Sequence, residues 1–107
     1  MAELETFPNP GVAAVRLTSD ELSSICPLTR QPDLYTLAIM YRPHQTCLET
    51  RSLKRYLGTF RNEEHFCEAL AVRIRDDIAE ALGVEKEKVA VDLTQKARGG
   101  ITISATV

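Results

Sequence analysis

The order of its hydrophobic repeats constrains the fold of this chain more than any other feature. Residues 34–41 follow a period of two, which is typical of a largely buried β-strand. Across residues 63–82 the apolar repeat lengthens to four, which predicts a helix that ends at Gly83. Alternation by two returns at residues 89–93 and 101–105, on either side of a glycine pair. The apolar stripe of the predicted helix consists of Phe66, Leu70, Ile74, Ile78 and Leu82.

Two further segments complete the predicted order of elements. Residues 12–17 form a short apolar run with strand character, and residues 49–59 suit a short helix that ends near Gly58. Asn62 is expected to cap the start of the longer helix. The order β-β-α-α-β-β predicts an α+β fold, with an antiparallel sheet and both helices on one face. A four-stranded sheet has two open edges, so the pattern also indicates lateral association.

The remaining segments are predicted to be irregular. Residues 1–11 contain two prolines and a glycine without periodicity, which indicates a flexible N-terminal arm. Residues 18–30 are mostly polar, so we expect a loop that presents Cys26 near its end. A chain of 107 residues has room for a single domain, residues 12–107. Any large active site would therefore be shared between copies.

Composition and charge narrow the functional classes. The chain is 44% hydrophobic and 26% charged, which is typical of a globular domain with a packed core. A net charge of −2 gives no general attraction for phosphate backbones, which argues against nucleic-acid binding. The chain lacks a run of about 18 apolar residues, and its first ten residues do not resemble a secretion signal. We therefore expect a cytoplasmic protein that does not bind membranes.

The cysteines indicate a reducing compartment. Cys26, Cys47 and Cys67 are odd in number and lack C-x-x-C spacing, which argues against a disulfide framework or an ordinary structural zinc site. Three free thiols are the better interpretation. Because most free cysteines are buried and inert, each one needs its own reason to be called functional.

One of these cysteines begins a recognisable motif. The segment Cys26-Pro-Leu-Thr-Arg-Gln-Pro-Asp33 resembles the catalytic loop of the NADPH-dependent 7-cyano-7-deazaguanine reductases, a tunnelling-fold family that makes a queuosine precursor for tRNA modification. Residues 49–56, Glu-Thr-Arg-Ser-Leu-Lys-Arg-Tyr, resemble the NADPH motif of that family at five of eight positions. Phe60-Arg-Asn62, Phe66-Cys-Glu68 and Arg98-Gly-Gly100 follow in the expected order, so the resemblance covers roughly residues 12–106. The family typically has Phe-His-Glu, so Cys67 replaces a histidine.

The resemblance implies covalent chemistry at Cys26. A thiolate is the best soft nucleophile of a protein near neutral pH, and its attack on a nitrile carbon gives a thioimide. Two molecules of NADPH then supply the four electrons that reduce the nitrile to an aminomethyl group. The resemblance assigns proton transfer to the nitrile nitrogen to Asp33. Composition alone would instead favour a packing thiol and a turn acid at these two positions.

The resemblance also implies residues that bind the two small molecules. Glu68 would accept hydrogen bonds from the guanine-like ring held at a neighbouring subunit's loop, with Glu49 and Ser52 as further substrate contacts. A solvated acid in the first turn of a helix is the alternative for Glu68. The expected NADPH contacts are Arg51, Ser52, Lys54, Arg55, Arg98 and Gly99. Arg51, Lys54 and Arg55 have helical i, i+3, i+4 spacing, which suits phosphate binding but is equally compatible with a solvated basic face.

Assembly and alternative reactions complete the expectations. The resemblance implies a homo-oligomeric barrel, a decamer of two pentamers with sites at subunit interfaces and no metal. A related amidinotransferase would form the same thioimide but pass it to ammonia, and a zinc-dependent pterin-type cyclohydrolase of the same fold would use Cys26, Cys67 and a histidine as ligands. A binding scaffold without catalysis is a third alternative. The NADPH motif at residues 49–56 favours the reductase.

Overall fold

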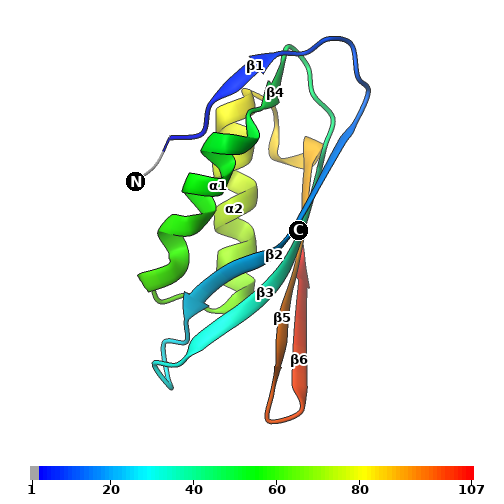
Figure 1. The fold of residues 1–107 in the computed structure, drawn as a ribbon. Coiled ribbons are helices and arrows are strands. Elements are labelled where there is room, and N and C mark those ends of the chain that lie inside the picture. The colour runs from blue at the N-terminus through cyan, green and yellow to red at the C-terminus, as the bar shows by residue number, and fades with distance from the viewer. Residues whose placement is uncertain (1–2) are drawn as a thin grey trace.

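An antiparallel sheet with two helices on one face makes up the body of the molecule (Figure 1). The computed structural model describes residues 3–107. The four sheet strands lie in the order β2-β3-β5-β6. The α+β class and the β-β-α-α-β-β order are therefore confirmed. These elements are β2 (Val15–Ile25), β3 (Pro32–Tyr41), α1 (Thr50–Gly58), α2 (Cys67–Leu82), β5 (Val89–Arg98) and β6 (Ile101–Thr106).

The N-terminal segment is hydrogen-bonded to the body of the molecule. The expectation of a flexible arm over residues 1–11 is therefore wrong for residues 5–9. Strand β1 (Thr6–Pro8) pairs antiparallel with β4 (Thr46–Leu48). The backbone N–H of Asn9 also donates to the carbonyl of Gln45 at 2.8 Å. Three residues with a terminal proline are too short to show a period of two, which is why the sequence pattern misses this strand. Residues 1 and 2 of the predicted arm lie outside the described residues.

Strand β2 is longer than the sequence pattern indicates, and the loop expected over residues 18–30 shrinks to residues 26–31. A bulge between Ser19 and Leu22 adds one residue to β2 relative to β3. Before the bulge the odd-numbered residues face the helices, whereas after it the even-numbered Leu22 and Ser24 are buried. This change of phase, together with a serine on the buried face, hides the strand from a search for regular alternation.

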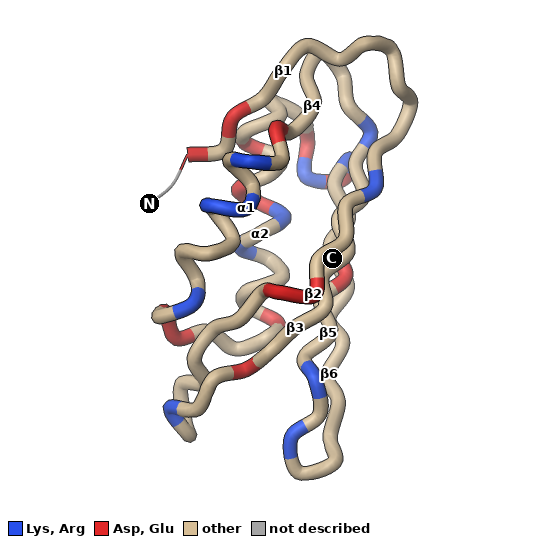
Figure 2. Tube along the Cα trace, viewed as in Figure 1, with Lys and Arg blue, Asp and Glu red and all other residues tan. Residues whose placement is uncertain are grey.

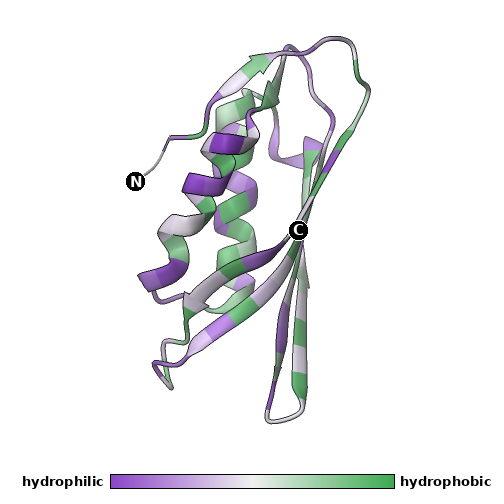
Figure 3. Cartoon of the chain, in the orientation of Figure 1, coloured by the Kyte–Doolittle hydropathy of each residue, from purple (hydrophilic) through white to green (hydrophobic). Residues whose placement is uncertain are grey.

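The core lies between the sheet and α2, and both carry apolar residues (Figure 3). Strand β3 and residues 89–93 of β5 bury every second residue, as their sequence alternation predicts. On α2, Leu70, Ile74 and Ile78 are completely buried. Phe66, the first member of the predicted stripe, is instead 50% exposed because it precedes the helix. Among the described residues, no helix is long and apolar enough to cross a membrane.

Helix α2 begins four residues later than predicted because the preceding chain pairs with β2. The N–H of Ile25 donates to the carbonyl of Glu63, and the N–H of His65 donates to the carbonyl of Ile25. These bonds hold residues 63–65 in extended conformation beside the end of β2. Asn62 therefore does not cap α2; it ends a short 3₁₀ helix, Thr59–Asn62. The pairing also brings the start of α2 next to Cys26.

The β5-β6 hairpin closes as the glycine pair predicts. Gly99 and Gly100 have φ angles of 61° and 81°, and Arg98 pairs with Ile101 across the turn. A two-residue hairpin turn with positive φ at both positions requires residues such as glycine. The turn places Arg98 at the end of the molecule that carries Cys26, where its guanidinium donates to the Thr29 hydroxyl.

Candidate active site

Cys26 stands at the start of a tight turn, residues 26–31, which we call the cysteine turn. Its backbone N–H donates to the carbonyl of Gln31 at 2.8 Å, and its carbonyl accepts from the N–H of Arg30 at 2.9 Å. Arg30 has a φ of 62°, a left-handed conformation that closes the turn, and its guanidinium forms an ion pair with Glu64. The cysteine turn is therefore fixed at both ends by backbone hydrogen bonds.

The Cys26 thiol is half-buried and is surrounded by hydrogen-bond donors. The Thr29 side chain lowers the pKa of Cys26 most, and the backbone N–H groups of Thr29 and Leu28 lower it further. Donors stabilise the thiolate more than the thiol, so a larger fraction of the side chain is ionised near neutral pH. An accessible sulfur with a lowered pKa has the properties of a nucleophile.

Asp33 lies next to the cysteine turn, on the buried face at the beginning of β3. The residue is 3% exposed and is the register partner of Ser24 on β2. Nη1 of Arg98 lies 3.0 Å from its Oδ1, but the two are not aligned as a hydrogen bond. Within residues 3–107, Oδ1 has no hydrogen-bond partner. A buried carboxyl oxygen without a hydrogen bond is unusual in a folded protein, and here the nearby Arg98 guanidinium offsets its burial through charge.

Two buried hydroxyl groups lie on the same face of the sheet as this carboxyl, and no sequence motif marks them. The hydroxyl groups of Ser24 and Tyr35 are both completely buried and are hydrogen-bonded to each other at 2.8 Å. Burial is the main cause that raises the pKa of Tyr35, and the charges of Asp33, Cys67 and Cys26 raise it further. The alternation of β3 places Tyr35 inside, so its hydroxyl needs a buried partner, but the sequence does not indicate which one.

Cys67 differs from Cys26 in both burial and environment. Its side chain is 2% exposed, and its thiol donates to the carbonyl of Leu93 at 3.6 Å. Burial raises the pKa of Cys67, as do the charges of Glu68 and Asp33. All three cysteines are free, so Cys26 and Cys67 form no disulfide. Cys67 thus has the properties of a packing thiol.

Glu68 lies exposed in the first turn of α2, three residues after His65, whose backbone N–H donates to the carbonyl of Ile25. The resemblance implied that Glu68 acts at the loop of a neighbour. In the single chain the start of α2 lies beside the end of β2, through the backbone bonds of Ile25, and the role of Glu68 at a neighbour's loop stays a prediction.

The predicted basic residues do gather on α1. Arg51, Lys54 and Arg55 are all exposed on this helix (Figure 2). Glu5 lies among them: its carboxylate accepts from Nη2 of Arg55 at 3.1 Å and lies 3.8 Å from Nη2 of Arg51. The face therefore carries a partly neutralised cluster of cations.

Glu49 and Ser52 have structural roles at the start of α1. The Glu49 carboxylate caps the helix by accepting from the backbone N–H groups of Ser52 and Arg51, and these donors lower its pKa. The Ser52 hydroxyl is completely buried; it donates to the Glu49 carbonyl and accepts from the N–H of Glu5. Because its hydroxyl is buried and already hydrogen-bonded, Ser52 offers no exposed atom for the expected contacts with substrate and NADPH.

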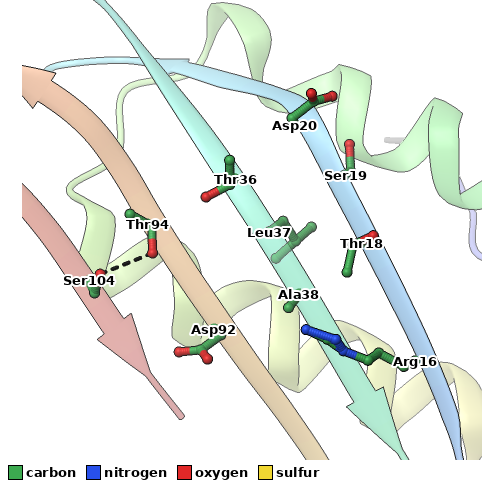
Figure 4. Close-up of a pocket in the computed structure, with 10 residues that line it drawn as sticks. All are labelled: Arg16, Thr18, Ser19, Asp20, Thr36, Leu37, Ala38, Asp92, Thr94 and Ser104. Carbon is green, nitrogen blue, oxygen red and sulfur yellow. Dashed lines mark hydrogen bonds between the residues drawn. The ribbon is translucent and has the colours of Figure 1, made fainter.

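A groove of about 600 Å³ lies on the sheet face opposite the helices, away from these groups (Figure 4). It is lined by side chains such as Arg16, Asp92 and Thr94, and Thr94 is hydrogen-bonded to Ser104 at 2.9 Å. The groove contains neither a thiol nor Asp33, so its size does not make it the candidate site.

Comparison with known proteins identifies the family. Residues 32–107 match the model of the QueF-like protein family. The chain belongs to the QueF-like family.

Curated relatives of this QueF-like protein span nearly its whole length. A protein named NADPH-dependent 7-cyano-7-deazaguanine reductase from Frankia casuarinae is 46% identical over 96% of this chain and 82% of its own length. Proteins of the same name from Anaeromyxobacter sp. (strain K) and Syntrophobacter fumaroxidans are 41% and 43% identical, over 92% and 99% of this chain and 82% and 69% of their own lengths. The crystal structure of the archaeosine synthase QueF-Like in the apo form superposes with a TM-score of 0.80 at 21% identity, over 91% of this chain and 93% of the other. At that identity the likeness shows a shared fold.

The position of Cys67 in this QueF-like chain leads to a prediction. Cys67→Ser should keep nitrile reduction within a few-fold of the unchanged protein, because a hydroxyl can donate to the Leu93 carbonyl in place of the thiol. Following the absorbance of NADPH at saturating substrate checks this, and Cys47→Ser serves as the control at a second buried thiol. Complete loss of turnover in Cys67→Ser alone would mean that this sulfur takes part in the chemistry.

Proposed function

We propose that this chain is an NADPH-dependent 7-cyano-7-deazaguanine reductase, which converts the nitrile of its substrate to an aminomethyl group for queuosine biosynthesis. The observation that carries the proposal is that the half-buried Cys26 thiol, whose pKa is lowered, begins the tight turn that leads into the buried Asp33 carboxyl. The names of the relatives support it. Consumption of two NADPH per nitrile, with none consumed when the nitrile is omitted, is the expected result of the direct assay.

The residues of this chain supply the nucleophile and the proton. The Cys26 sulfur forms a bond to the nitrile carbon as one carbon–nitrogen π bond breaks, and the nitrogen takes a proton from Asp33, which leaves a neutral thioimide. When bound, NADPH would supply both hydrides, one for the thioimide carbon and one for the imine that remains once the carbon–sulfur bond breaks and the Cys26 thiol is released. Each hydride is accompanied by one proton, so the four-electron balance closes at the primary amine.

The substrate ring needs a recognition group near the cysteine turn, and Glu68 is the candidate. An ionised carboxylate can accept two hydrogen bonds from the N–H and amino edge of a guanine-like ring. Glu68 is exposed at the start of α2, and within residues 3–107 its carboxylate forms no hydrogen bond or ion pair, whereas the Glu49 carboxylate is occupied as a helix cap. We therefore assign ring binding to Glu68, and the substrate contact expected of Glu49 stays a prediction.

The basic face of α1 fits the phosphates of NADPH. Two guanidinium groups and one ammonium group lie exposed on consecutive turns, which suits a pyrophosphate and a 2′-phosphate. Glu5 would have to leave Arg55 when a phosphate binds. Arg98 and the adjacent Gly99 do not lie on this surface, because the Arg98 guanidinium contacts the cysteine turn. Their expected contacts with NADPH stay a prediction.

Removing one cation of the α1 face should weaken NADPH binding. Arg51→Ala and Lys54→Ala are each expected to raise the KM for NADPH by about tenfold, the effect of losing a charge-assisted hydrogen bond, with little change in nitrile capture. Glu5→Gln should shift the KM in the opposite direction, because it removes the competing carboxylate. Initial rates at varied NADPH measure all three. Arg42→Ala, at an exposed arginine beyond β3, is the control, and equal KM values in every variant would remove the α1 face from the proposal.

We propose that the complete site includes a second copy of the chain. The first turn of α1 and the cysteine turn lie at opposite ends of the molecule (Figure 1), so phosphates bound at α1 of one chain would serve Cys26 of a neighbour. Exposed apolar side chains surround the end with the cysteine turn, as an interface would require: Leu28, Leu34, Phe66 and Ile101. Strands β2 and β6 are open sheet edges. We infer a homo-oligomer in the cytoplasm, of decameric size as the resemblance implies.

The alternatives differ in observable ways. An amidinotransferase would form the same thioimide but consume no NADPH, and the basic face of α1 favours the reductase. The cyclohydrolase would need a third ligand beside Cys26 and Cys67. Among residues 3–107, no three histidine, cysteine, aspartate or glutamate side chains are arranged to hold a metal, and the Cys67 thiol points at Leu93.

A further inference from the structure

A single arginine from the β5-β6 hairpin contacts three parts of the segment that holds Cys26 and Asp33. Nη2 of Arg98 donates to Oγ1 of Thr29 at 2.9 Å, and Nη1 donates to the Pro32 carbonyl at 3.4 Å. Nη1 also lies 3.0 Å from Oδ1 of Asp33. Arg98 is 69 residues from Thr29 in the sequence, so only the fold brings them together.

The backbone of β5 directs this side chain. Between Gln95 and Arg98 the strand has one more residue than its partner β6, which is the pattern of a bulge. Bulges next to active sites commonly turn a side chain toward a new direction. The two-residue turn at Gly99 and Gly100 then holds the end of the strand in place.

The hydrogen-bonding capacity of Thr29 determines the direction of its proton. Its hydroxyl oxygen accepts from the N–H of Gln31 at 3.2 Å and from Nη2 of Arg98 at 2.9 Å. A hydroxyl has two acceptor lone pairs and one proton, so both lone pairs are used and the proton is left to donate. The Cys26 sulfur is the neighbour that this side chain stabilises in its ionised form.

We propose that Arg98 is a positioning residue of the reaction: by occupying the Thr29 hydroxyl it turns the Thr29 proton toward the Cys26 sulfur, and its second nitrogen holds Asp33 beside the nucleophile. This role rests on the proposed function, and the phosphate contact that the resemblance implies for Arg98 stays a prediction. Lysine cannot reproduce it, because a single ammonium does not have the fork of donors that reaches Thr29, Pro32 and Asp33 together.

The test measures the reactivity of Cys26 without nitrile or NADPH. Iodoacetamide labelling across a pH series, with peptide mapping, gives the pH at which the Cys26 alkylation rate is half-maximal. Thr29→Val and Arg98→Ala should both move this midpoint upward and slow labelling at neutral pH by roughly three- to tenfold, the effect of losing one hydrogen bond to an anionic sulfur. Thr29→Ser should restore the original midpoint. The double variant should behave like either single variant, because Arg98 acts through Thr29.

Arg98→Lys keeps the positive charge but loses the forked guanidinium. It provides a second variant in case Arg98→Ala unfolds the cysteine turn. It should also move the midpoint upward, whereas Arg42→Ala should leave it unchanged. Unchanged midpoints in Thr29→Val and Arg98→Lys would overturn the proposal, as would an Arg98→Lys variant whose sole defect is a raised KM for NADPH. Failure of the proposed function is a separate result: the nitrile would then not be reduced, while the labelling midpoints would still move.

Discussion

Incubating this protein with 7-cyano-7-deazaguanine in the absence of NADPH should add the mass of one ligand to each chain, at Cys26. The thiol is accessible, and donors from the cysteine turn lower its pKa, so a larger fraction is thiolate than in an ordinary cysteine. Without a hydride donor the thioimide has no forward path, so it should accumulate. Adding NADPH should discharge it and return the mass of the free chain. Intact mass spectrometry and peptide mapping follow each step.

Substitutions separate this capture from other thiol reactions. Cys26→Ala should form no adduct and lose turnover by on the order of a thousandfold or more, since no other group can form the thioimide. Cys47→Ala should form the adduct normally, because Cys47 is buried near Asn9, at the β1-β4 pair. An adduct mapped to Cys47 or Cys67, or nitrile reduction by Cys26→Ala, would contradict the mechanism.

The parts of the fold that follow one hydrophobic period could be predicted from the sequence. Residues Leu37 and Ile39 on β3 and Ile74 and Ile78 on α2 show their burial directly through periods of two and four. The elements that were missed break a period. In β2 a bulge shifts the buried face from Ser19 to Leu22, and before α2 the backbone bonds to Ile25 are non-local and leave no local pattern.

The same distinction applies to the candidate site. A motif of adjacent residues could predict the nucleophile Cys26 and the acid Asp33. Contacts between distant strands were not predictable: the Ser24–Tyr35 hydrogen bond links β2 to β3, and Arg98 reaches the cysteine turn from β5. The resemblance implies a cofactor contact for Arg98, and an arginine beside two glycines gives no local indication that its guanidinium contacts Thr29. Likewise Ser52 fits the motif, yet its hydroxyl is used to tie Glu5 to α1.

Asp33→Asn should slow formation of the Cys26 adduct by roughly a hundredfold, the scale of a lost general acid. Asparagine has the same shape and can remain beside Ser24 and Arg98, so the β2-β3 pairing should survive and the melting temperature should change little. The nitrile nitrogen becomes strongly basic as the carbon–nitrogen π bond breaks. An amide cannot deliver the proton this nitrogen needs at that moment. The defect should therefore appear in the rate of adduct formation at saturating nitrile, measured by rapid quenching and intact mass.

Glu68→Gln provides the matched comparison for Asp33→Asn, because it also replaces a carboxylate with an amide of the same shape, but at the exposed start of α2. It should weaken nitrile binding through the loss of charged hydrogen bonds while leaving the rate of capture at saturation within a few-fold. Asp33→Asn should do the reverse, because the Asp33 carboxyl is buried beside the sulfur and has no part in holding the ring. The pair thus separates proton transfer from recognition. If Asp33→Asn raised only the nitrile concentration needed for half-maximal capture, Asp33 would be a binding group, and the nitrogen would have to take its proton from water or from another side chain.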